Sequence, residues 1–64
     1  MNSMNIVKTG DDHYHVEVKN FFVKEDVNDS QLLGMLHAHS HNGEEVLSFL
    51  DKQDVGYEMT VDYD

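Results

Sequence analysis

The chain has 64 residues, which is enough for at most one domain that buries about 60% of its unfolded surface. It carries 13 acidic residues against four lysines and no arginine, so its formal net charge is −9. Such a field repels DNA, RNA and anionic membranes, which argues against direct binding to any of them. Without cysteine, neither a disulfide framework nor a zinc–thiolate centre can stabilise the domain.

The rest of the composition predicts a folded protein. With 39% hydrophobic residues at regular spacing, a packed core is expected rather than a disordered acidic tail. We see no apolar region of the length that a signal peptide or a membrane span needs, so we expect a cytoplasmic protein. It should form a single domain over residues 1–64, with residues 1–4 as a flexible lead-in.

The first third of the chain predicts a β-hairpin. Residues 4–9 form a short strand, and residues 10–12 (Gly-Asp-Asp) supply the turn. The return strand alternates between an apolar face with Tyr14, Val16 and Val18 and a polar face with His13, His15, Glu17 and Lys19. The alternation is lost at residues 21–23 (Phe-Phe-Val), where we expect a bend or bulge that buries both aromatic rings.

A capping signal starts the first predicted helix. Asn28 as N-cap and Gln31 three residues later form a reciprocal capping box, and Val27 and Leu32 flank it as a hydrophobic staple. Leu32 and Leu36 then begin a buried stripe at helical spacing.

The same signal recurs for a second helix. Asn42 and Glu45 have the spacing of a capping box, and Val46, Phe49 and Leu50 follow on one helical face. Residues 54–56 break this pattern.

The last ten residues predict a strand. Apolar side chains alternate with polar ones over residues 55–64, which gives one core face and one acidic face. The order is therefore ββααβ, an α+β fold with an antiparallel sheet and a helical hairpin on one face. Exposed sheet edges on so small a domain favour pairing between two copies, so a homodimer is expected.

Five histidines allow a metal-site interpretation. His13 and His15 share a strand face, and His37 and His41 are one helical turn apart, so the four would form a tetrahedral site if the fold joined them. Such spacings also arise easily by chance, and ordinary polar histidines at a helix end are the simpler explanation. A pH switch is a third interpretation, because protonating all five histidines changes the net charge from −9 to −4.

Catalytic motifs are missing from the sequence. We find no cysteine nucleophile, glycine-rich phosphate loop or GxSxG elbow, and the paired acids at 11–12 and 44–45 fit a turn and a helix start. We therefore expect no enzymatic activity and no cofactor.

The carboxylates remain as candidate binding groups. Asp62 and Asp64 should lie about 6.6 Å apart along a strand, close to two phosphate steps of about 3.4 Å along DNA, so a row of carboxylates can imitate a phosphate backbone. Whether the acidic residues share one face stays open at this point. The candidate partner-binding residues are Asp11, Asp12, Glu17, Glu44, Glu45, Asp51, Asp54, Glu58, Asp62 and Asp64.

In size, acidity, lack of cysteine and the acidic strand YEMTVDYD, the chain resembles the small acidic proteins that bacteriophages make early for host takeover, DNA mimics among them. The resemblance implies a stoichiometric inhibitor that occupies the nucleic-acid-binding surface of a basic host protein, such as a nucleoid-associated protein, a polymerase or a nuclease. A histidine-mediated metal-binding protein and a generic oligomeric regulatory subunit are the alternatives.

Overall fold

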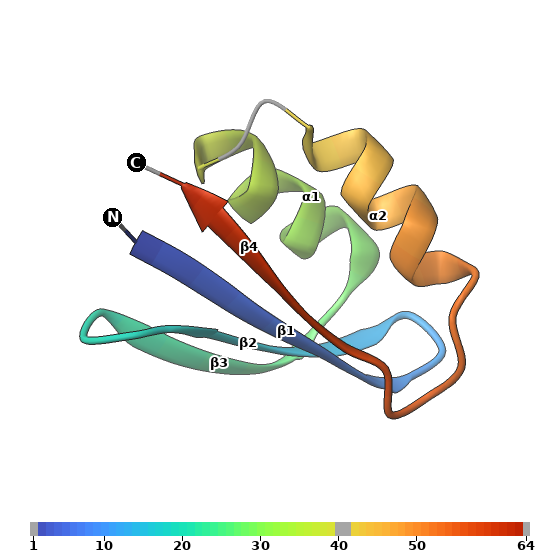
Figure 1. Ribbon diagram of the computed structural model, residues 1–64. Coiled ribbons are helices and arrows are strands. Elements are labelled where there is room, and N and C mark those ends of the chain that lie inside the picture. The colour runs from blue at the N-terminus through green and yellow to red at the C-terminus, as the bar shows by residue number, and fades with distance from the viewer. Residues whose placement is uncertain (1, 40–41, 64) are drawn as a thin grey trace.

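The computed structural model describes residues 2–39 and 42–63, and within them the chain is an α+β fold of four strands and two helices. The elements in chain order are β1 (Asn2–Gly10), β2 (His13–Val18), β3 (Phe22–Val27), α1 (Asp29–His39), α2 (Gly43–Asp51) and β4 (Glu58–Tyr63). The strands form one antiparallel sheet in the order β3-β2-β1-β4, and both helices lie over the same face of it (Figure 1).

β3 is a strand that the sequence prediction did not contain, so the predicted order ββααβ is corrected to βββααβ. The chain turns after Val18, whose carbonyl accepts the Phe21 N–H at 2.9 Å, and returns along β2. Three consecutive charged residues at 24–26 remove the apolar–polar alternation by which a strand is recognised in a sequence. The pairing with β2 also shifts register between Tyr14 and Val16. Asp26 has a φ of 56° beside this irregularity. A bulge of this kind breaks the period of two that would reveal a strand.

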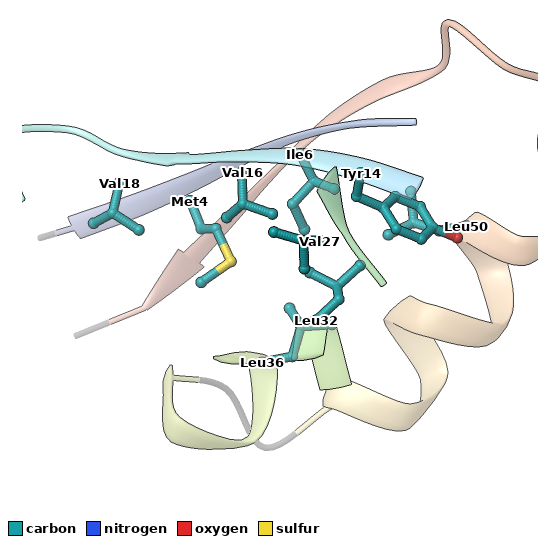
Figure 2. Close-up of a cluster of buried hydrophobic side chains, with 9 residues drawn as sticks. All are labelled: Met4, Ile6, Tyr14, Val16, Val18, Val27, Leu32, Leu36 and Leu50. Carbon is teal, nitrogen blue, oxygen red and sulfur yellow. The ribbon is translucent and has the colours of Figure 1, made fainter. Parts of the chain in front are cut away.

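The core lies between the sheet and the helices (Figure 2). Alternate residues of β1 and β2 point into it, because successive side chains of a strand face opposite sides. Met4 is completely buried and β1 begins at Asn2, so residues 2–4 belong to the sheet. The flexibility expected for residues 1–4 stays a prediction. The buried hydrophobic side chains are Met4, Ile6, Tyr14, Val16, Val18, Val27, Leu32, Leu36 and Leu50.

The capping box of α1 is confirmed. The Gln31 N–H donates to Asn28 Oδ1 at 2.8 Å, and the Asn28 N–H donates to Gln31 Oε1 at 3.0 Å. Val27 and Leu32, the two residues of the predicted staple, are both buried in the core. Residues close in sequence therefore determine where this helix begins.

Three local predictions are corrected. Asn42 does precede α2, but among the described residues its side chain makes no capping hydrogen bond, so the predicted box with Glu45 does not form. Phe21 is 68% exposed instead of being buried as predicted, because it lies in the β2–β3 turn. The last strand starts at Glu58 rather than Val55, because Gly56 adopts a φ of 99° in a turn that precedes β4.

Candidate functional site

One face of the sheet carries no helix, and strand alternation places four carboxylates on it. Both helices lie over one face of the sheet (Figure 1). The core residues of each strand point to that face, so their sequence neighbours point to the other side. We call this side of the sheet the open face. Its acidic residues are Glu17, Glu25, Glu58 and Asp62.

The lysines are segregated from these acids. Lys8 is 5% exposed and lies on the helix side of β1, and Lys24 pairs with Val16, whose side chain also faces the helices. Lys19 lies in the turn after β2, and Lys52 follows α2. Within the described strands, the open face therefore carries carboxylates and no lysine.

The acids of the open face lie along two margins. Glu17 in β2 and Glu25 in β3 form one margin, and Glu58 and Asp62 in β4 form the other. Neighbouring strands are about 4.8 Å apart, so β2 and β4 are separated by about 10 Å and β3 and β4 by about 14 Å. The strand between the margins, β1, is neutral on this face, where it presents Ser3, Asn5 and Val7.

Hydrogen bonds and an ion-pair geometry orient two of these carboxylates. Asn5 Nδ2 donates to Glu58 Oε2 at 2.8 Å, and Thr60 Oγ1 donates to Asn5 Oδ1 at 3.3 Å. On the other margin, His15 Nδ1 lies 3.4 Å from Glu25 Oε1. Because the Glu25 side chain is 78% exposed, solvent screens this pair, and it contributes little to stability.

A second acidic group lies where the β1–β2 turn meets both helices. The Asp29 N–H donates to Asp12 Oδ1 at 2.6 Å, and the Tyr14 hydroxyl donates to Asp51 Oδ1 at 2.8 Å. Burial raises the pKa of Asp29, and the neighbouring carboxylates Asp51 and Asp12 raise it further. Burial and the hydrogen bond to Asp51 likewise raise the pKa of Tyr14. We call Asp12, Asp29 and Asp51 the aspartate cluster.

The ten predicted binding residues therefore do not form one patch. Three lie on the open face (Glu17, Glu58, Asp62), and two belong to the aspartate cluster (Asp12, Asp51). The others are exposed in the β1–β2 turn (Asp11), the first turn of α2 (Glu44, Glu45) and the loop before β4 (Asp54). Asp64 lies outside the described residues.

The histidines are separated by the sheet. His13 and His15 point to the open face, whereas His37 belongs to α1 on the other side of the sheet. These three histidines are therefore not brought together, and the predicted site of four histidines does not form. His41 lies outside the described residues. Within the part of the chain that the structure describes, no three histidine or carboxylate side chains are grouped so that they could hold a metal ion.

Within the described part of the chain, two shallow hollows lie beside α1. One, of about 480 Å³, separates β3 from α1 and is lined by Lys24, Glu25, Asp26, Val27, Gln31 and Met35. The other, of about 320 Å³, is lined by His37, Asn42, Glu44 and Glu45 at the start of α2. Both are open to solvent rather than enclosed, unlike the pockets that surround most small ligands.

Comparison with protein-family models, curated proteins and solved structures finds no match to this chain. Among the described residues, no helix has the length and apolar character needed to cross a bilayer.

Three residues of these acidic surfaces were missed at the sequence level. Glu25 escaped because β3 was not recognised, although its charged neighbours marked a solvent-facing segment. Asp29 follows the predicted N-cap directly, which was a signal for a carboxylate at the positive end of a helix. Tyr14 was assigned to the core, but the bond from its hydroxyl to Asp51 depends on tertiary contact.

Proposed function

We propose that this chain is a non-enzymatic acidic module that binds a basic protein through its open face and competes there with nucleic acid. The observation that carries the proposal is the segregation of charge. Four carboxylates lie on the open face, and the described strands direct their two lysines, Lys8 and Lys24, to the opposite side of the sheet. Surfaces of one sign steer partners of the opposite sign and give fast, salt-sensitive association.

The arrangement of the acids favours mimicry of DNA over a merely acidic surface. The two margins are about 10–14 Å apart across a neutral strip, which compares with a major groove about 12 Å wide between phosphate backbones. A protein that binds DNA would therefore find two lines of negative charge separated by about the width of the major groove. A nucleoid-associated protein, a polymerase or a nuclease is the type of target, and inhibition would be stoichiometric.

Affinity capture from a nuclease-treated bacterial lysate tests the proposal. The wild-type chain is compared with a double variant, Glu58→Gln and Asp62→Asn, which removes two charges from the open face. The matched control, Glu44→Gln with Glu45→Gln, removes two charges from α2. We expect the open-face variant to lose about tenfold in affinity for the captured protein, or about 1.4 kcal/mol for two contacts, while the control retains it.

Competition with duplex DNA provides the second readout. The captured protein should bind DNA, and added DNA should displace it from the wild-type chain. An equal loss in both double variants would mean that net charge alone is recognised. A captured protein that DNA does not displace would refute mimicry while leaving protein binding intact.

A further inference from the structure

The aspartate cluster joins three segments that are distant in sequence. Asp12 belongs to the β1–β2 turn, Asp29 is the first residue of α1, and Asp51 is the last residue of α2. Tyr14 from β2 completes the group through its bond to Asp51. The cluster therefore lies where both helices meet the sheet.

One oxygen in the cluster lacks a hydrogen-bond donor. Asp29 Oδ1 is buried, and within the described chain it has no hydrogen-bond partner. The other two aspartates of the cluster act as acceptors, since Asp12 Oδ1 accepts the Asp29 N–H and Asp51 Oδ1 accepts the Tyr14 hydroxyl, and a carboxylate can only accept hydrogen bonds. The Tyr14 hydroxyl proton is already directed to Asp51. Lys8, a buried lysine of β1, directs its ammonium to the backbone carbonyls of Leu50 and Asp51.

We propose that Asp29 holds a proton that it shares in a hydrogen bond with the neighbouring carboxylates. This hydrogen bond stabilises the packing of both helices against the β1–β2 turn. A protonated carboxyl supplies the O–H donor that this cluster of acceptors otherwise lacks. Loss of the proton places a negative charge on Asp29 at a partly buried site, where Asp51 and Asp12 act on it as like charges that repel it. Rising pH therefore loosens this end of the fold.

The sign of the effect follows from linkage. The pKa of Asp29 is raised in the folded state, first by burial and then by Asp51 and Asp12. Its contribution to stability is therefore complete below the ordinary carboxyl range and is lost as the pH rises through the folded-state value. This is the reverse of a salt-bridged aspartate, which stabilises a fold as it ionises.

Substitution of Asp29 by asparagine tests the proposal. The amide is close in shape to the protonated carboxyl and donates a hydrogen bond at every pH. The matched control is Glu44→Gln, because Glu44 is also an acid in the first turn of a helix but is exposed. Thermal unfolding is followed from pH 4 to pH 8 for the wild type and both variants.

We expect Asp29→Asn to raise Tm by about 4–8 °C at pH 8, a shift large enough to resolve in a domain of this size, and to leave it nearly unchanged at pH 4. Glu44→Gln should show no gain at pH 8, since it only removes a favourable charge from a helix start. If the Tm difference of Asp29→Asn follows that of Glu44→Gln at every pH, the proposal is wrong.

Two measurements keep the test independent of one variant's folding. The carboxyl carbon of Asp29 in the wild-type chain, followed by NMR, should titrate above the ordinary aspartate range, and an ordinary midpoint would overturn the proposal. Amide exchange protection at Lys52 and Gln53, which close the end of α2, should fall with rising pH in the wild type. Unchanged protection at these two amides would show that protonation of the cluster does not stabilise the end of α2.

Discussion

Replacing Lys8 with methionine should destabilise the fold, because this buried lysine links β1 to the end of α2. Its side chain is 5% exposed, and its Nζ donates to the carbonyls of Leu50 at 3.2 Å and Asp51 at 3.3 Å. The ammonium thus lies at the negative end of the α2 dipole. Methionine keeps the apolar stem of the side chain and removes only the charge and its hydrogen bonds.

The magnitude follows from these contacts. Hydrogen bonds from a charged donor contribute about 1.5–3 kcal/mol each, and both bonds are longer than the usual 2.9–3.0 Å, which favours the lower figure. Part of the loss is recovered, since the Leu50 carbonyl keeps the Gln53 N–H at 3.0 Å and the ammonium no longer has to be desolvated. We expect a net destabilisation of about 2 kcal/mol.

Urea denaturation provides the assay. With an m-value of about 1–2 kcal/mol/M for a small domain, the midpoint should fall by about 1–2 M. Lys52→Met is the matched control: it removes the same charge from the same helix end, where the side chain is exposed, and should change stability by less than about 0.5 kcal/mol. A Lys8→Met variant as stable as the wild type would show that desolvation of the ammonium cancels its bonds, and the reasoning would fail.

Three further substitutions probe local packing. Gly34→Ala should stabilise the chain by about 0.5–1 kcal/mol in urea denaturation, because nothing lies within 4 Å of the added methyl group in the middle of α1. Gly43→Ala should destabilise it in the same assay, because the added methyl group would lie 3.1 Å from Leu36 Cβ; equal effects of the two alanines would contradict this. Tyr14→Phe should cost about 1 kcal/mol through the lost bond to Asp51. It should also remove the fall in stability that phenol ionisation causes above about pH 10, which an alkaline titration of the unfolding midpoint would detect.

Short-range patterns were sufficient for much of the secondary structure. The reciprocal bonds of Asn28 and Gln31 involve residues three apart, so the sequence could indicate the start of α1. The alternation in β2 and β4 likewise predicted which side chains face the core, because a strand that packs on one side needs an apolar residue at every second position. Each of these signals depends on neighbours within about four residues.

Pairing between distant segments decided the rest. β3 is a strand because it forms antiparallel pairs with β2, and its own residues show no apolar–polar alternation that would predict it. Asn42 fitted a capping box as well as Asn28 did, yet only the latter forms one, so the same local spacing has two outcomes in two tertiary settings. Sequence spacing therefore predicts a cap without guaranteeing it.

The acidic surfaces show the same division. The sequence by itself determined the charge of −9 and the number of carboxylates, and these already indicated a basic partner over a nucleic acid. Only the tertiary structure brought Glu17 and Glu58 to one open face and drew Asp12, Asp29 and Asp51 together. The physical reason is that the interaction between charges depends on their distance in space and on burial, and both are determined by strand register and helix docking.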